Sequence, residues 1–296
     1  MKFDIDNCTL CPRVCHADRT KQAGICGGRD TIRCARAMLH NWEEPCISGK
    51  NGSGAIFFSG CALHCRFCQN VVISAEPYGK DLTPERLAEI MLNLQEQGVH
   101  NINFVTACHF VPWVIDALDI AKPSLKIPIV WNTGGYETVE TLQALEGYVD
   151  IYLPDFKFFN PETAKNYANA ENYPEIAKKA LSEMLRQTGK PVFDGTLLKK
   201  GCIVRHLVLP KHRHESIALL QYLAETHGTD KFLLSLMSQY TPMQQDAVYP
   251  ELNRRITKME YYSVLDKAQE LGFDGYLQDS SSAKEEYTPD FHLQGL

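Results

Sequence analysis

The chain has 296 residues, of which 44% are hydrophobic and 22% charged, with a formal net charge of −6 and a pI near 5.9. A chain of this length can bury a sizeable core, and its acidic balance argues against binding to nucleic acid or to an anionic membrane surface. No stretch approaches the roughly 18 uninterrupted apolar residues of a membrane-spanning helix, and the first six residues do not resemble a signal peptide. We therefore expect a cytoplasmic protein that binds neither nucleic acid nor membranes.

The N-terminal part of the chain is rich in cysteine. The chain has eleven cysteines, mostly in close groups, which in a protein expected to be cytoplasmic indicates metal ligands rather than disulfides. Cys8, Cys11, Cys15 and Cys26 offer four thiols within 19 residues, in a segment with too little apolar content to fold on its own core. A metal that joins these thiols is the natural explanation. Structural zinc and a second [4Fe-4S] cluster both remain open.

A second cysteine motif follows the apolar run 55–58, which predicts a buried strand. Cys61, Cys65 and Cys68 have the spacing C-x3-C-x2-C. This spacing brings three thiolates round one corner of a small cluster, and thiolates are the soft ligands that iron–sulfur clusters require. Three ligands leave one iron of a four-iron cube without a protein ligand. The structural alternative is a set of three buried or zinc-bound cysteines.

This motif resembles the signature of the radical S-adenosylmethionine (SAM) enzymes, which also has an aromatic residue, here Phe67, one place before the third cysteine. The resemblance implies a [4Fe-4S] cluster whose open iron chelates S-adenosylmethionine. It also implies that one electron from the reduced cluster breaks a C–S bond of the bound sulfonium, which releases methionine and a 5′-deoxyadenosyl radical that abstracts a hydrogen atom. The motif indicates the cluster and the cofactor but not the substrate.

Apolar runs of strand length alternate with helical patterns after residue 55. The expected strands are 55–58, 101–105, 127–131, 149–153, 203–209 and 232–237. The expected helices are 84–97, 112–121, 138–145, a helix-rich insert over 161–188, 216–226 and 257–271. Six strands each followed by a helix predict a parallel sheet with helices outside, curved into most of a barrel.

Six units instead of eight leave such a barrel open. The resemblance implies the same fold, an α/β protein with a partial (β/α)6 TIM-like barrel whose substrate enters along the open side. We expect a Cys-rich metal-binding segment over 1–54, the barrel over 55–240 and a C-terminal helical extension over 241–296 that packs on it. The polar tail 280–286 is expected to be flexible.

Polar residues gather where the predicted strands end, which is where barrels of this kind hold their chemistry. Each taken alone is ordinary turn chemistry, but five strand ends with such groups predict a pocket. The candidates are Thr106 and Cys108 after the second strand, Asn132 and Thr133 after the third, Asp155 and Lys157 after the fourth, Arg205 and His206 in the fifth, and Gln239 after the sixth. His206 lies on an apolar strand, which favours a core histidine over a site residue.

Several of these residues belong to strings that resemble the pyruvate formate-lyase activating enzymes over about residues 55–240. The strings are Cys68-Gln69-Asn70, Asn132-Thr133-Gly134 and Asp155-x-Lys157, with Arg205 near Pro210, while 42–49 and 204–210 resemble an uncharacterised branch of these activases. The resemblance implies cofactor binding at Thr106, Cys108, Asn132, Thr133, Asp155 and Gln239. It makes Lys157 and Arg205 candidates for contacts to the cofactor or a substrate backbone, with structural salt bridges to Asp155 or Glu183 as the alternative.

Two departures from the activase pattern affect the predicted pocket. Residues 106–108 stand where the activases have a Gly-Gly-Glu turn whose backbone carbonyls hold the cofactor's ammonium group. Asn132 replaces an aspartate at a monovalent-cation site that Thr133 and Asp155 would share. Backbone carbonyl groups can hold the ammonium group whatever the side chains of the turn are. The cation site, however, has one negatively charged ligand fewer than in the activases.

Three functions from different classes remain open at this point. The first is a radical enzyme that abstracts hydrogen from a backbone glycine of a partner and so makes a glycyl radical, with a flavodoxin or ferredoxin-type protein as reductant. The second is a radical enzyme that acts on a small molecule or another peptide. The third is a noncatalytic iron–sulfur electron carrier or a metal-stapled binding module. The cysteine motif favours the first two, and the activase-like strings favour the first.

Overall fold

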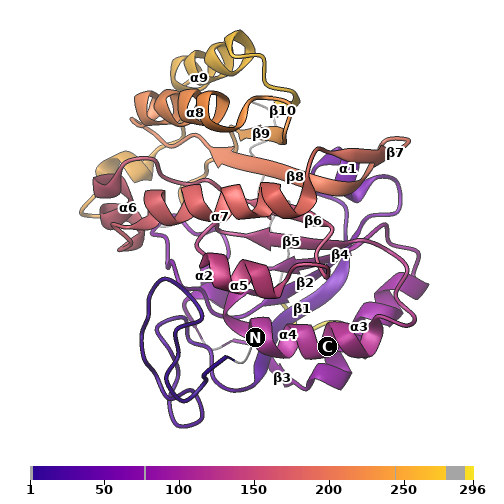
Figure 1. Ribbon diagram of the computed structural model, residues 1–296. Coiled ribbons are helices and arrows are strands. Elements are labelled where there is room, and N and C mark those ends of the chain that lie inside the picture. Colours follow the sequence, from indigo (N-terminus) through magenta and orange to yellow (C-terminus); the bar gives the residue numbers. More distant parts are fainter. Residues whose placement is uncertain (1–2, 77, 244, 278–290) are drawn as a thin grey trace.

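A single curved sheet forms the centre of the protein, shown in Figure 1 as a computed structural model in which residues 3–76, 78–243, 245–277 and 291–296 are described. The strand order is β10-β9-β8-β6-β5-β4-β2-β1-β3, with β7 paired to β8 outside this path. The strands are β1 (Ile32–His40), β2 (Ser53–Phe58), β3 (Lys80–Leu82), β4 (Ile102–Val105), β5 (Ile129–Thr133), β6 (Ile151–Pro154), β7 (Val192–Asp194), β8 (Leu197–Leu207), β9 (Leu233–Met237) and β10 (Gly275–Leu277).

Helices follow the strands in the same order, from α3 and α4 through α5 and α7 to α8 and α9 (Figure 1). They are α1 (Pro45–Ser48), α2 (Val71–Ser74), α3 (Pro84–Glu96), α4 (Val111–Ala121), α5 (Val139–Ala144), α6 (Pro161–Ala168), α7 (Tyr173–Thr188), α8 (Arg213–His227) and α9 (Lys258–Glu270), with 3-10 turns η1 (Cys108–Phe110) and η2 (Pro250–Asn253). Among the described residues, no helix has both the length and the apolar character to cross a membrane.

The prediction of an α/β fold with six parallel strands is confirmed. β2, β4, β5, β6, β8 and β9 are neighbours in that order, and each pair is parallel. One register row, Ile56–Phe104–Trp131–Tyr152, crosses four strands and is fully buried. These strands read as continuous apolar runs because helices cover one face and side chains of the barrel interior cover the other.

Local sequence explains where the predicted helices begin. The Thr83 hydroxyl accepts a hydrogen bond from the backbone N–H of Arg86, and Pro84 takes the first helical position of α3. Leu87, Ile90 and their apolar neighbours then form the buried face of that helix. The long insert expected over 161–188 is two helices, α6 and α7, separated where Asn169 adopts a left-handed conformation.

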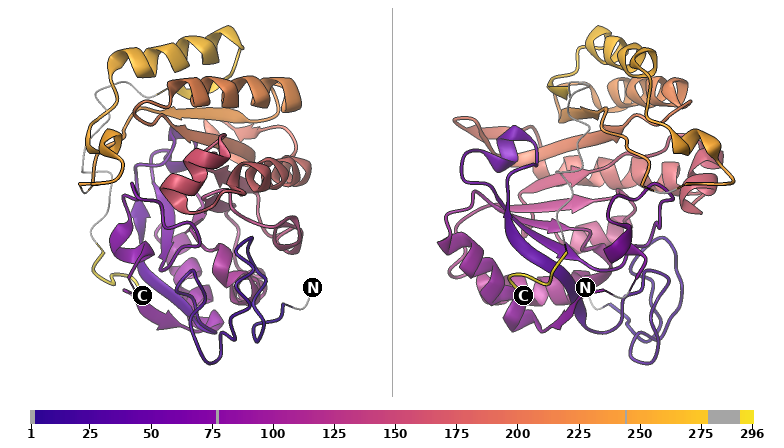
Figure 2. Two further views of the ribbon diagram at one scale, coloured as in Figure 1. Left: turned by 90° about the vertical axis from the view of Figure 1, so that its left-hand side faces the viewer. Right: turned by 180° about the vertical axis from the view of Figure 1, so that it is seen from behind.

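The sequence did not predict the strands at the two edges of the sheet. β1 lies antiparallel to β2, with Leu39 opposite Gly54, and places residues 32–40 of the expected N-terminal segment in the main sheet. Residues 291–296 run beside β1, where the Ala37 N–H donates to the Gln294 carbonyl oxygen (Figure 2). The boundaries expected at residues 54 and 240 stay predictions, and the tail 280–286 lies outside the described residues.

Candidate active site

A large cavity of about 1130 Å³ lies at the C-terminal ends of the parallel strands. Its walls come from the strand ends, from the segment that holds the second cysteine motif and from the loop between β1 and α1. Ten of the residues predicted from sequence line it together: Cys61, Cys65, Cys68, Thr106, Asn132, Thr133, Asp155, Lys157, Arg205 and Gln239. The polar strand ends therefore do meet in one pocket, as parallel strands in a barrel require.

The three cysteines of the C-x3-C-x2-C motif form one wall of this cavity and are free thiols. The Leu63 N–H points to the Cys61 sulfur at 3.4 Å, and the Ser74 hydroxyl to the Cys68 sulfur at 3.4 Å. Burial raises the pKa of Cys65, and the positive charge of Lys157 opposes this rise. Sulfurs that receive hydrogen bonds and face a cation are suited to bind as thiolates, so the donor set fits an iron–sulfur cluster.

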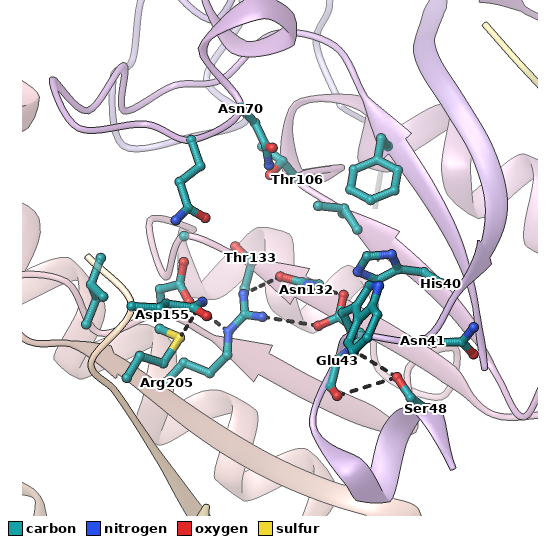
Figure 3. A pocket seen from close by; sticks show the side chains of 18 of the residues that line it. His40, Asn41, Glu43, Ser48, Asn70, Thr106, Asn132, Thr133, Asp155 and Arg205 are labelled. Atoms are coloured by element: carbon teal, nitrogen blue, oxygen red, sulfur yellow. Dashed lines mark hydrogen bonds and ion pairs between the residues drawn. The ribbon is translucent and has the colours of Figure 1, made fainter. Parts of the chain in front are cut away.

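Arg205 lies at the centre of a second, polar wall of the cavity and contacts three of its side chains. Its Nε donates to Asp155 Oδ1 at 2.8 Å, Nη2 donates to Asn132 Oδ1 at 2.5 Å, and Nη1 lies 3.4 Å from Glu43 Oε2 (Figure 3). All these side chains are mostly buried. The guanidinium thus binds oxygens from three separate elements, which the planar fork of arginine does better than lysine.

Lys157 pairs with the other oxygen of the same aspartate, since Nζ lies 2.5 Å from Asp155 Oδ2. Burial alone would raise the pKa of Asp155, but Arg205 and Lys157 together hold it below its ordinary value. Of the two salt bridges considered for these cations, the one with Asp155 forms, whereas Glu183 pairs with Arg186 on α7. The Asn132 and Asp155 oxygens expected to hold a monovalent cation thus accept hydrogen bonds from protein cations.

Glu43 is the site residue that sequence reasoning missed. It lies in the loop between β1 and α1, where Oε1 accepts hydrogen bonds from Asn103 Nδ2 at 2.9 Å and Asn132 Nδ2 at 3.3 Å. Burial raises the pKa of Glu43, and Arg205 opposes this rise. The resemblance of the string 42–49 to an activase branch was a signal for this loop. It did not place Glu43 over the pocket, because that position depends on the antiparallel pairing of β1 with β2.

The turn after β4 has an unusual backbone. Thr106 has a φ of 61°, which is rare for a β-branched residue and marks a position that glycine would suit. It faces the cavity across from Arg205 (Figure 3). The Cys108 thiol, by contrast, does not line the cavity and lies buried in η1, so its role in cofactor binding stays a prediction.

His206 is a core residue, as its apolar strand favoured. It is buried, with Nδ1 at 2.7 Å from the Phe156 carbonyl oxygen and Nε2 at 2.8 Å from the Ser216 hydroxyl. Because both ring nitrogens have partners within the fold and burial lowers the pKa of His206, this imidazole is held neutral between β8 and α8. It does not line the cavity.

The four N-terminal cysteines lie together outside the cavity, against the cluster motif. The Cys61 N–H donates to the Cys26 carbonyl oxygen at 3.0 Å, and His64 Nε2 lies 2.9 Å from the Ile25 carbonyl oxygen. Among the described residues, no three His, Cys, Asp or Glu side chains already surround the position of a single metal ion. Metal binding by the N-terminal thiols stays a prediction.

A known family model matches the part of the chain that holds the C-x3-C-x2-C motif and most of the polar strand ends. Residues 55–223 match the model of the Radical SAM superfamily. The chain is 30% identical over 278 residues to the uncharacterized protein MJ0674 of Methanocaldococcus jannaschii, which covers 90% of this chain and 76% of that protein.

Solved structures of low sequence identity resemble the fold. Methylornithine synthase (PylB) is 15% identical, with a TM-score of 0.49 over 73% of this chain and 63% of that one. SuiB of Streptococcus suis is 15% identical, with a TM-score of 0.46 over 75% of this chain and 47% of that one. The chain therefore spans less than two thirds of either protein. By the family match, which spans more than half of its length, this chain belongs to the Radical SAM superfamily, whose enzymes use a [4Fe-4S] cluster and S-adenosylmethionine for radical chemistry.

Proposed function

We propose that this protein is a cytoplasmic radical enzyme that abstracts a hydrogen atom from a polypeptide, and that its first candidate substrate is a backbone glycine of a glycyl radical protein. The observation that carries the proposal is the set of carboxamide side chains in the cavity, Asn41, Asn51, Gln69, Asn70, Asn132 and Gln239. Asn132 and Asn51 already form hydrogen bonds within the fold, whereas the carboxamides of Asn41, Gln69 and Asn70 can each offer a peptide group one donor group and one acceptor, which suits a segment of extended chain.

The size of the cavity also supports a polypeptide substrate. Its volume of about 1130 Å³ is above the roughly 300–1,000 Å³ of most small-molecule pockets. A single cofactor would therefore leave room for part of a second molecule. The cavity charges, which include those of Glu43, Asp155, Lys157 and Arg205, are largely paired with one another, so a neutral peptide segment can bind without a counter-charge of its own.

Each part of the cavity has a role in this proposal. Cys61, Cys65 and Cys68 hold the [4Fe-4S] cluster, which with S-adenosylmethionine supplies the radical. The carbonyl groups of the turn that begins at Thr106 accept hydrogen bonds from the cofactor's ammonium group. Arg205, with Lys157 beside it, supplies the positive charge near the cofactor carboxylate, in place of a monovalent cation. The walls exclude water from the radical.

Two further parts of the proposal lie outside the cavity. A flavodoxin or ferredoxin-type protein delivers the electron. The four N-terminal cysteines bind either zinc or a second iron–sulfur cluster, which is developed below.

The proposal is tested with the anaerobically reconstituted protein, S-adenosylmethionine, a reductant and glycyl radical proteins of the host. Electron spin resonance should detect a glycyl radical on one partner, and the Cys65→Ala variant should give none. If 5′-deoxyadenosine forms but no partner acquires a radical, the glycyl radical proposal fails and a small molecule or another peptide takes its place as substrate. If no 5′-deoxyadenosine forms, both enzyme functions fail together.

A further inference from the structure

The N-terminal segment brings four thiols together without a helix or strand to hold them. Residues 3–31 contain neither element (Figure 1), yet Cys8, Cys11 and Cys26 are buried. A Cβ atom built on Gly24 would lie 3.4 Å from the Cys15 sulfur and 3.6 Å from the Cys26 sulfur. Both of these thiols therefore border the same small space.

Backbone N–H groups point at these sulfurs. Gly28 N lies 3.4 Å from the Cys26 sulfur, the Arg13 N–H donates to the Cys11 sulfur, and the Ala17 and Ile25 N–H groups donate to the Cys15 sulfur. Hydrogen bonds of this kind stabilise negative charge on sulfur. These donors oppose the burial that raises the pKa of Cys11 and of Cys26, and they remain available to thiolates that a metal ion would stabilise.

A buried cation without a carboxylate lies beside them. Arg19 is fully buried, and no carboxylate among the described residues lies within ion-pair distance of it. Its Nη1 donates to the His109 carbonyl oxygen at 2.6 Å and its guanidinium stacks 4.9 Å from the Trp113 ring centroid, but Nε has no partner. Burying a charge without a counter-ion is strongly unfavourable, so the fold has to supply a negative group near this guanidinium.

The cysteine group can supply this negative charge, because Arg19 interacts electrostatically with Cys26. A Cβ atom on Gly28 would lie 2.7 Å from Arg19 Nη2 and 3.3 Å from the Cys26 sulfur, so the guanidinium and the sulfur face one another across this glycine. The His109 ring lies at the same point, 3.0 Å from that Cβ position, and its buried Nδ1 has no partner. The Arg19 guanidinium and the His109 ring thus border the space beside the Cys26 sulfur.

We propose that Cys8, Cys11, Cys15 and Cys26 hold an anionic metal–tetrathiolate centre and that Arg19 is its buried counter-ion. This deepens the second-metal part of the proposed function and rests on it. Four thiolates around Zn²⁺ or around a [4Fe-4S]²⁺ core leave a net charge of about −2 in either case. Binding releases the four thiol protons to water and draws the sulfurs together, because no three ligands surround a single ion position among the described residues.

The centre is also tied to the catalytic cysteine loop. The Cys26 carbonyl oxygen accepts from the Cys61 N–H at 3.0 Å, and Arg13 Nε donates to the Ala62 carbonyl oxygen at 2.7 Å. A Cβ atom on Gly60 would collide with the Cys26 carbonyl oxygen, so the two backbones are in close contact. Metal bound at the N-terminal thiols therefore fixes the position of the first cluster ligand.

The centre itself is tested in the full chain after the catalytic cluster has been removed by the triple substitution Cys61→Ala, Cys65→Ala, Cys68→Ala. The anaerobically purified triple variant should retain about one zinc or about four irons per chain, as measured by mass spectrometry, with absorption near 400 nm only for iron. Adding Cys11→Ala should remove this metal, whereas adding Cys202→Ala, a buried thiol away from both groups, should not. A triple variant without bound zinc or iron overturns the proposal, whether or not the wild-type protein cleaves S-adenosylmethionine.

The counter-ion is tested by Arg19→Met and Arg19→Lys in the same triple variant. Loss of metal to a chelator should be at least about tenfold faster with methionine, which keeps most of the packing but not the charge, than with the parent arginine. Lysine should restore most of the difference. Equal release rates from all three proteins refute the counter-ion role. If Arg19→Met does not fold, Arg19→Lys against Arg19→Gln gives the same comparison, with slower release expected from the charged variant.

Discussion

The ion network around Arg205 gives the sharpest prediction about stability. Arg205→Met leaves the Asp155 and Glu43 carboxylates without the guanidinium that lies 2.8 Å and 3.4 Å away. Removing one partner of a buried ion pair costs about 3–5 kcal/mol. Water still reaches part of this network, because the exposed fraction of the side chain is 15% for Arg205, 19% for Asp155 and 9% for Glu43. Lys157 also still pairs with Asp155. We therefore expect a loss of stability at the lower end of this range, about 3 kcal/mol. For a chain of 296 residues this lowers the melting temperature by about 5 °C.

The effect of Arg205→Met should depend on pH. Burial already raises the pKa of Glu43 against the attraction of Arg205, and without the guanidinium the pKa rises further. A carboxyl whose folded pKa lies above its unfolded value binds more protons in the folded state, so stability falls as pH rises above the ordinary carboxyl range. The difference between variant and wild type should therefore be smaller at pH 5 than at pH 8.

Thermal melts of the metal-loaded proteins under anaerobic conditions measure this effect. Arg205→Lys keeps the charge but loses the fork, and should fall between the other two proteins. Arg86→Met is the control, because its pair with Glu89 is largely exposed and should change stability by less than about 0.5 kcal/mol. If Arg205→Met melts like the Arg86 control, or if its effect is the same at pH 5 and pH 8, the network does not stabilise the fold as we describe.

Three further predictions concern the thiols, the cation site and a buried acid. Cys65→Ala should abolish formation of 5′-deoxyadenosine, while Cys202→Ala, buried outside the cavity, should keep it within about twofold by chromatography. Arg205 occupies the oxygens of the expected cation site. Replacing K⁺ and Na⁺ by tetramethylammonium should therefore change the rate of 5′-deoxyadenosine formation by less than about twofold, and a tenfold loss would contradict the role of Arg205 in place of the cation. Burial raises the pKa of Glu137 from 4.5 to about 7, so this group makes stability fall by about 3 kcal/mol as pH rises across that interval. Glu137→Gln should reduce this slope in denaturant titrations at pH 5 and pH 8, and an unchanged slope would count against the buried acid.

The central strands could be predicted because their residues carry the signal themselves. Phe104 and Trp131 belong to strands buried on both faces, which produce short continuous apolar runs between helical patterns. β1 gives no such signal, since Arg33 and Arg36 alternate with buried positions and the strand is recognisable only from its pairing with β2. Edge strands depend on a partner far along the chain, and sequence patterns do not report that partner.

The same distinction applies to the site. Asp155 and Arg205 could be predicted because a residue at the end of a parallel strand is carried to the same rim in any barrel. Glu43 could not, since its place over the cavity depends on the pairing of an edge strand that the sequence did not reveal. Arg19 could not either, because only the folded chain buries its guanidinium beside Cys26.

Reductive cleavage of S-adenosylmethionine tests the central claim most directly. The anaerobically reconstituted protein is reduced, mixed with S-adenosylmethionine and assayed by liquid chromatography with mass detection, with the iron–sulfur signal recorded in the same sample. We predict that methionine and 5′-deoxyadenosine form in equal amounts, and that neither forms with Cys65→Ala. A protein that carries an intact, reducible [4Fe-4S] cluster and still releases no 5′-deoxyadenosine would contradict the account.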